Sequence, residues 1–144
     1  MLLLMTFLGR PPDGKSLREY QRDRWGRVEG GETCVIELSG LAANSLKVDR
    51  DRTQFRQERI AVIRQRMLTY KPSLVVMYGK SESEHWQEIA GSDQTWPPDS
   101  ILQRESTVLV YTRHPVTPGR CNADWLDLGE RLRHVALGTG THSA

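Results

Sequence analysis

Cysteine is scarce in this chain, and its cysteines and histidines do not cluster. The 144 residues include only Cys34 and Cys121, which lie far apart and form no CxxC pair. This pattern argues against a disulfide scaffold and a zinc site, and it is typical of a reducing cytosol. The four histidines show no HxxxH or HExxH spacing. We therefore expect no metal and a cytoplasmic location.

Long apolar runs and the common cofactor motifs are also absent. No stretch is long enough to span a membrane, and MLLLMTFLGRPP lacks the basic start and cleavage site of a signal peptide. That opening is expected to form a buried strand or a short helix. GxGxxG, a P-loop and GxSxG do not occur, so nucleotide-cofactor and α/β-hydrolase chemistry have no direct support. We expect neither a cofactor nor a membrane partner.

The composition that remains fits one soluble globular domain. Hydrophobic residues make up 38% and charged residues 26% of the chain, and its length is sufficient to bury a core. We expect a single monomeric domain over residues 1–144. In this prediction residues 1–16 are irregular or form a degenerate first strand, and residues 136–144 form a flexible tail.

Apolar runs alternate with helical patterns along the chain. Three β-branched or aromatic runs bounded by turn residues predict buried strands at Thr33–Leu38, Ser73–Tyr78 and Thr107–Thr112. Apolar stripes predict helices at Asp51–Tyr70, at Glu82–Ala90 and from Asn122, a good N-cap. This order favours an α/β fold, a three-layer α/β/α sandwich with a mainly parallel central sheet.

In such sheets ligands collect outside the carboxyl ends of the strands. That rule predicts substrate-binding residues at Ser39, Asn44, Gly79, Lys80, Pro115 and Thr117. His114 follows the last strand directly, where its imidazole can bond a ligand while Pro115 restricts the backbone. The alternative is a strand-ending histidine that bonds a nearby carbonyl.

Arginine dominates the basic residues, with sixteen of the twenty, and its planar fork matches phosphate oxygens. Arg56 and Arg52 continue the apolar stripe of the helix at Asp51–Tyr70 backward by steps of four. They would point toward the mouth of the crevice and, with Arg113, bind phosphate. In the alternative interpretation, Arg52 and Arg56 extend into water from a fraying first turn.

The order of these motifs resembles the uracil-DNA glycosylase superfamily. A strand, His114-Pro115, a proline-containing turn and a helix started by Asn122 are similar to the last third of that family. PSLVVMYGK resembles its preceding strand, CVIELSGLAANSLK the strand before that, and LREYQRDRWGRVEGGET an uncharacterised branch. The resemblance covers about Leu17 to Val135.

The resemblance implies that a base is flipped out of DNA and read in a pocket. His114 would donate a hydrogen bond to the base as negative charge develops on it. Pro115, Pro118 and Gly119 would shape a loop against the minor groove, and Glu37 to Ser39 would lie at the base-reading strand end.

Two departures from the family weaken the expectation of catalysis. The glycine-rich loop with a water-positioning acid would have to come from the first fifteen residues, where Asp13 fits poorly, or the chain is an amino-terminally shortened copy that lacks the central strand of the sheet. No residue is an obvious aromatic stack for a base, since core packing is the usual fate of Tyr78, Trp86 and Trp96. Three hypotheses follow: a metal-independent DNA glycosylase, a non-catalytic nucleic-acid or nucleotide binding module, and an unrelated cytosolic α/β domain.

Overall fold

The computed structural model describes residues 1–36, 38, 50–79, 82–93, 95–115 and 118–138, and of residues 50–52 only the backbone. A three-stranded mixed sheet lies at its centre, in the order β1-β3-β2. The strands are β1 (Leu74–Tyr78), β2 (Ile101–Arg104) and β3 (Thr107–Thr112). β1 is parallel to β3, whereas β2 is antiparallel to it. All six residues of the central strand β3 are buried.

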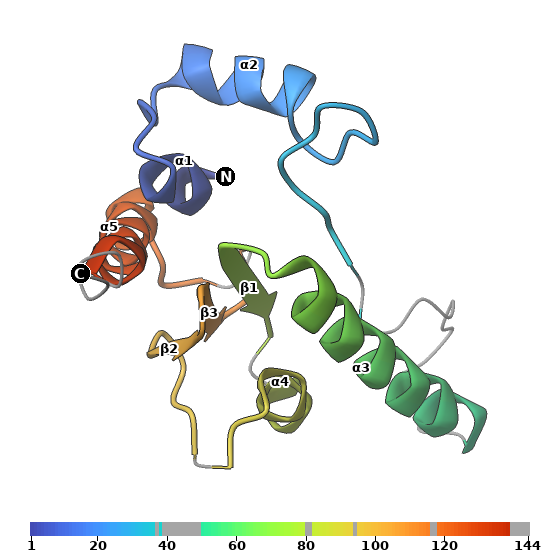
Figure 1. Cartoon of the computed structure of the whole chain (residues 1–144). Helices are drawn as coiled ribbons and strands as arrows, with labels where there is room; N and C mark the ends of the chain where they lie inside the picture. Colours follow the sequence, from blue (N-terminus) through green and yellow to red (C-terminus); the bar gives the residue numbers. More distant parts are fainter. Residues whose placement is uncertain (37, 39–49, 80–81, 94, 116–117, 139–144) are drawn as a thin grey trace, which may run out of the picture.

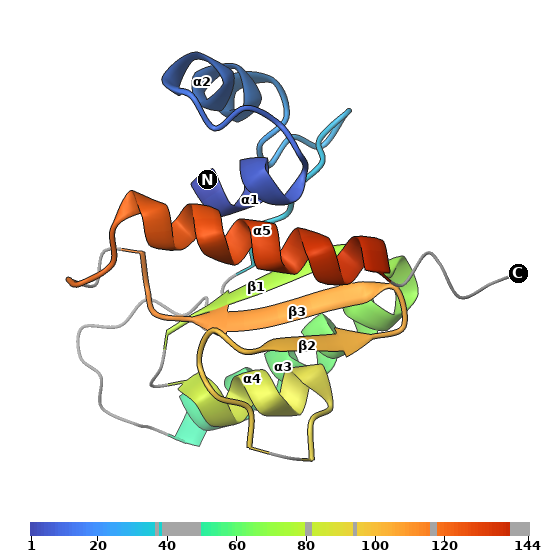
Figure 2. The same ribbon diagram turned by 90° about the vertical axis from the view of Figure 1, so that its left-hand side faces the viewer.

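Helices lie on both faces of this sheet (Figures 1 and 2). α3 (Arg50–Tyr70) and α4 (Ser83–Ala90) cover one face, and α5 (Asn122–Gly138) covers the other. α1 (Leu2–Phe7) packs on α5, and α2 (Gly14–Asp23) lies beyond α1, away from the sheet. Side chains of β3 alternate between the faces, as the pleat requires. Leu109 packs with Ile60 of α3 and Ile89 of α4 in one apolar cluster. Val108 packs with Leu128 of α5 in another.

Most of the expected elements are present close to their expected bounds. The apolar run Thr107–Thr112 is strand β3, and the run at Ser73–Tyr78 contains β1. The three expected helices are α3, α4 and α5. Breaker residues explain this agreement, because Lys71-Pro72 and Gly91 directly follow helices α3 and α4. The fold class is therefore mixed α and β, as expected.

The strand expected at Thr33–Leu38 is wrong for the residues that the structure describes. Residues 33–36 and 38 belong to no strand, and residue 37 lies outside the description. Glu32 donates its backbone N–H to the Arg24 carbonyl at 3.2 Å, and Gly26 donates to the Thr33 hydroxyl at 2.9 Å. These bonds tie the start of the segment to the end of α2 instead of to β1.

The prediction of a mainly parallel sheet also needs correction, because one of its two strand pairs is antiparallel. β2 and β3 form a hairpin in which Arg104 pairs with Thr107 across a two-residue turn. Glu105 in that turn has φ 49°, a conformation that usually selects glycine or asparagine. The expected turn signal is therefore missing from the sequence.

The chain start contains helices, not an irregular stretch or a degenerate first strand. Leu2–Phe7 is α1, in agreement with the short-helix alternative, and it packs on α5. Asp13, the residue considered for a catalytic loop, is the N-cap of α2 and accepts the N–H groups of Lys15 and Ser16. Residues 136–138 belong to α5, whereas the rest of the expected tail lies outside the described residues.

Candidate functional site

The carboxyl ends of β1 and β3 meet at one rim of the sheet. Tyr78 is in register with Thr112, and the Gly79 N–H donates to the Thr112 carbonyl at 2.9 Å. Gly79 has φ 108°, which a side chain would strain, so glycine suits this turn. The parallel pair thus brings Gly79 and His114 to the same rim, as the expected strand direction requires.

Three rings gather at this rim, and we call Tyr78, His114 and Trp125 the aromatic rim. The Tyr78 ring meets His114 edge-on, with centroids 6.5 Å apart, and meets Trp125 in the same way at 6.5 Å. Tyr78 is 39% exposed, and His114 is exposed as well. Burial raises the pKa of the Tyr78 phenol, although the positive charge of Arg120 opposes that rise. The hydroxyl therefore stays protonated at neutral pH and can donate.

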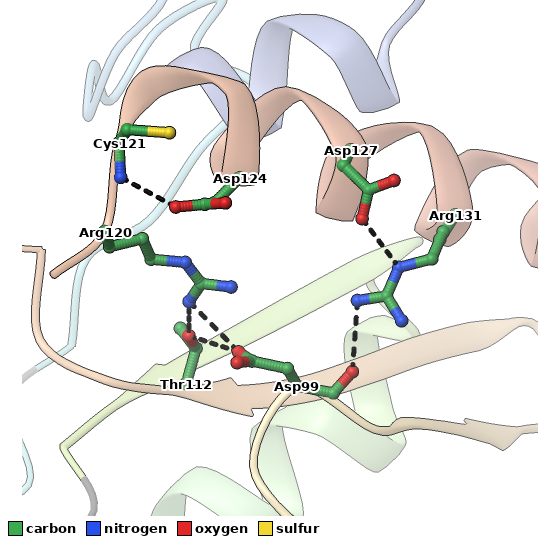
Figure 3. Close-up of polar contacts among 7 residues, drawn as sticks. All are labelled: Asp99, Thr112, Arg120, Cys121, Asp124, Asp127 and Arg131. Carbon is green, nitrogen blue, oxygen red and sulfur yellow. Dashed lines mark hydrogen bonds and ion pairs between the residues drawn. The ribbon is translucent and has the colours of Figure 1, made fainter.

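Arg120 fixes the position of Trp125. Its guanidinium carbon lies 4.2 Å from the centroid of the Trp125 ring, and its Nη1 is 3.0 Å from Asp99 Oδ1. Arg120 also donates to the Thr112 hydroxyl, which in turn donates to Asp99 Oδ1 at 2.6 Å (Figure 3). Its side chain is only 12% exposed. Arg120 is therefore an internal clamp whose charge is balanced by Asp99.

The start of α5 is held by a second carboxylate. Asp124 Oδ2 accepts the backbone N–H of Cys121 at 2.7 Å (Figure 3), which is one half of a capping box. That bond is the main reason why the pKa of Asp124 is lowered. The helix begins at Asn122, so Cys121 occupies the cap position that was expected for Asn122. The bond holds the first turn of α5, and Trp125 in that turn contributes its ring to the aromatic rim.

A groove of about 800 Å³ runs along β1 and reaches the rim at Tyr78; we call it the β1 groove. Its lining includes all five residues of β1, together with Ile63 and Met67 of α3 and Ile36 and Leu38 before it. Charged side chains stand at its ends. Arg56 and Glu82 line it together with Tyr78, and Arg66 lines it together with Tyr70.

Arg56 lines the β1 groove and has protein partners. Its Nη1 is 3.3 Å from His85 Nε2 and 3.9 Å from a Glu82 oxygen. His85 Nε2 is also 3.7 Å from Glu82. The Arg56 Nε is buried and has no hydrogen-bond partner within the described part of the chain. The guanidinium is thus only partly satisfied, which reduces but does not abolish its capacity for an anion.

The structure places part of the expected site. Gly79 is half-buried at the rim, and Arg113, His114 and Pro115 are exposed there. Ser39, Asn44, Lys80, Thr117 and the side chain of Arg52 lie outside the described residues. The sequence patterns did not single out Asp99, Thr112 or Arg120. Trp125 lies on the apolar stripe of the helix expected from Asn122, where core packing is the usual outcome, and the arginine five residues before it is the signal that could have indicated a contact with its ring.

Comparison of the chain with protein-family models, with curated proteins and with solved structures finds no match. The described residues contain no group of three or more side chains arranged to hold a metal ion. Nor does any helix among them combine the length and the apolar character that crossing a bilayer requires. The geometry of the rim therefore carries the functional argument.

Proposed function

We propose that the chain is a nucleic-acid binding module that holds an unstacked base against the aromatic rim. The observation that carries this proposal is the edge-on contact of the Tyr78 and His114 rings, 6.5 Å apart, on an exposed rim. Bases stack on such side chains without sequence preference, at about 1–3 kcal/mol per base. Trp125, held by Arg120, extends the same surface.

Basic groups next to the rim suit the phosphate backbone. Arg113 directly precedes His114 and is exposed, so it can contact a phosphate beside a base bound on the rim. Arg56 lies at the end of the β1 groove that Tyr78 lines, but Glu82 already offsets part of its charge. Arg113 is therefore the main phosphate contact in this proposal, and Arg56 a secondary one.

The proposal also includes the layered arrangement of the fold. Helices on both faces of the sheet, and a connection from β1 to the parallel β3 that contains α4 and β2, support a reduced α/β/α sandwich similar to uracil-DNA glycosylases. The domain acts as a monomer in the cytoplasm, where its two exposed cysteines stay reduced.

Hydrolytic release of a damaged base is the second candidate, and the exposed position of His114 favours it. The imidazole could donate to a carbonyl oxygen of a base on the rim, where leaving-group charge develops. The first residues of the chain do not provide the second part of such a site, because Asp13 is engaged as the cap of α2. Binding without base release is therefore the primary proposal.

Fluorescence anisotropy with a labelled single-stranded oligothymidylate tests the binding. The affinity should fall with salt concentration, because phosphate contacts release counterions. Tyr78→Ala and His114→Ala should each weaken it by roughly 5- to 100-fold, as expected for loss of a stacking contact. Tyr70→Ala and His134→Ala are matched controls, because both residues are exposed and lie away from the rim. Equal affinities for all four variants would refute the proposal.

A uracil-containing oligonucleotide decides between the two candidates. The binding module should retain the oligonucleotide without releasing uracil, even after long incubation. Release that disappears in His114→Ala and persists in His134→Ala would instead establish the hydrolytic function.

A further inference from the structure

The end of the sheet opposite the aromatic rim has a second hollow, of about 460 Å³. We call it the hairpin pocket, because the β2–β3 hairpin lines it together with the ends of α3 and α4. Lys71, which precedes β1, and Thr107, which begins β3, both line it. Because β1 and β3 are parallel, the pocket lies at their amino ends and the rim at their carboxyl ends.

Cationic side chains from three parts of the chain line the hairpin pocket. They are Arg64 of α3, Lys71 after α3 and Arg104 of β2. Glu105 is the one acidic residue among the described lining residues, and it pairs with Lys71 at 2.8 Å. With three cations and one carboxylate, the described lining has a net formal charge of +2.

Two of the cations converge on Gly91, the residue that ends α4. Arg104 Nη2 donates to the Gly91 carbonyl at 2.8 Å. Arg64 Nη2 lies 3.3 Å from the position that a Cβ on Gly91 would occupy. No hydrogen bond or ion pair joins Arg64 to any other residue that the structure describes. The end of a helix is equivalent to about half a negative charge, which Arg104 already offsets, so the charge of Arg64 has no counterpart.

Apolar side chains form the rest of the hairpin pocket. Met67 and Leu68 come from α3, and Ile89 and Ala90 come from α4. Ile89 and Ala90 are buried, whereas Leu68 is 61% exposed. The volume of the pocket lies in the range of about 300–1,000 Å³ that is usual for small-molecule sites. This combination suits a small ligand that has an anionic end and an apolar body.

We propose that the hairpin pocket binds a small phosphate monoester, with its phosphate at Arg64 and Arg104 and its organic part against Met67 and Ile89. Such a phosphate has a charge of about −1.5 to −2 at pH 7, which matches the net charge of the described lining. Its three oxygens can accept bonds from both guanidiniums at once, whereas a carboxylate offers two oxygens and a single charge. This site is separate from the aromatic rim and does not depend on nucleic-acid binding.

Phenyl phosphate is the probe, and phenyl sulfate, which has a similar shape but a single negative charge, is its matched control. Titration into the isotope-labelled chain, followed by amide chemical shifts, gives both the place and the affinity of binding. The largest shifts should occur at Gly91, Gln103 and Thr107, with phenyl phosphate bound several-fold more tightly. Equal affinities at neutral pH, or shifts elsewhere, would overturn the proposal.

The pH dependence of binding provides a second readout. The described lining residues include no histidine, so the phosphate itself is the group that titrates, with its second pKa at about 6. The affinity for phenyl phosphate should therefore fall toward that for phenyl sulfate as the pH falls below that value. An affinity for phenyl phosphate that does not change over this range would exclude recognition of the dianion.

Arg64→Ala should weaken phenyl phosphate binding roughly ten-fold or more, because a charged hydrogen-bond donor is lost. Arg66→Ala is the matched control, since Arg66 is an exposed arginine of the same helix that does not line the hairpin pocket. Glu105→Gln should strengthen binding by up to roughly five-fold, because it removes the acid and releases Lys71. A gain in affinity does not result from a loss of folding. Unchanged binding in both Arg64→Ala and Glu105→Gln would refute the site.

Phosphate groups of lipids and of nucleic acids are tested separately. Flotation with phosphatidylcholine vesicles, with and without phosphatidic acid, should show no binding. Attachment to the phosphatidic acid vesicles without a response to phenyl phosphate would overturn the proposal in favour of a membrane surface. Oligothymidylate should bind the parent chain and Arg64→Ala alike. If Arg64→Ala abolished that binding, the pocket would instead be a contact for the nucleic-acid backbone.

Discussion

The guanidinium of Arg120 lies against the face of Trp125, with its central carbon 4.2 Å from the ring centroid, and bonds Asp99. This contact joins the start of α5 to the loop before β2 and to the end of β3 through Thr112. It therefore stabilises the fold at the same place where it orders the aromatic rim.

Arg120→Ala should lower the free energy of unfolding by about 1–3 kcal/mol, because the Asp99 carboxylate and the Thr112 hydroxyl both lose a charged hydrogen-bond donor. The loss should stay below that of a fully buried ion pair, since Asp99 is 35% exposed. Urea unfolding measures it. The control is Arg22→Ala, whose pair with Asp23 is 69% and 49% exposed and is worth at most about 1 kcal/mol. Equal losses in both variants would contradict the clamp.

Gly129→Ala should destabilise the packing of α1 on α5. An added methyl group at Gly129 would lie 2.7 Å from the Leu3 carbonyl oxygen and 2.8 Å from the Thr6 Cβ. Because the first contact is with backbone, α1 must shift, at about 1–3 kcal/mol. Gly138→Ala is the control, since nothing lies within 4 Å of its added methyl group. Thermal unfolding that ranks the two variants equally would exclude close packing of the two helices.

The sequence predicts the pieces of this fold better than their assembly. Helices α3 to α5 and strands β1 and β3 follow from apolar periodicity and from breakers. The hairpin of β2 was missed because it is short and its turn uses Glu105 in place of glycine or asparagine. The apolar run at Thr33–Leu38 was read as a strand because lining a groove and pairing in a sheet demand the same alternation. Whether such a run pairs with a neighbouring strand depends on tertiary contacts, which its own alternation does not specify.

The sequence likewise predicts some parts of the candidate site and not others. The neighbouring positions of His114 and Gly79 were predicted because both residues follow strands that run in parallel. Arg120 and Asp99 were missed because they meet only after β3 and the loop before β2 are in place, 21 residues apart in sequence. Trp125 lies on an apolar stripe, and periodicity does not distinguish a core residue from one at the rim.

The cap of α2 should make stability depend on pH. Hydrogen bonds from the Ser16 backbone and hydroxyl, and from the Lys15 backbone, hold the pKa of Asp13 below its ordinary value of 3.8. Its contribution is thus complete above pH 3.8 and is lost as the pH falls through the folded-state pKa. Asp13→Asn retains a cap that does not titrate. The unfolding free energies of the parent chain and of this variant should therefore converge as the pH falls into the acid range. A difference between the two that stays constant with pH would disprove the cap.

The Tyr78 phenol should ionise at a pH above its ordinary pKa of 10.0, because burial disfavours the phenolate. Arg120→Gln should raise that pKa further, since the positive charge of Arg120 favours the phenolate. The folded state thus retains the proton longer, so the stability from Tyr78 is complete below pH 10.0 and is lost as the pH rises through the folded-state pKa. Ultraviolet titration, with the Tyr78→Phe curve subtracted, isolates this group. Ionisation at or below the ordinary pKa would show that the Tyr78 hydroxyl is fully solvated and would contradict its burial.

Amide chemical shifts recorded while oligothymidylate is added to the isotope-labelled chain test the central claim most directly. The aromatic rim should respond first, with the largest shifts at Tyr78, Gly79 and His114 and at the Trp125 indole. Those shifts should disappear in Tyr78→Ala and persist in Tyr70→Ala. Shifts confined to α2 or to the outer face of α3, with the rim unchanged, would contradict nucleic-acid binding at the carboxyl ends of β1 and β3.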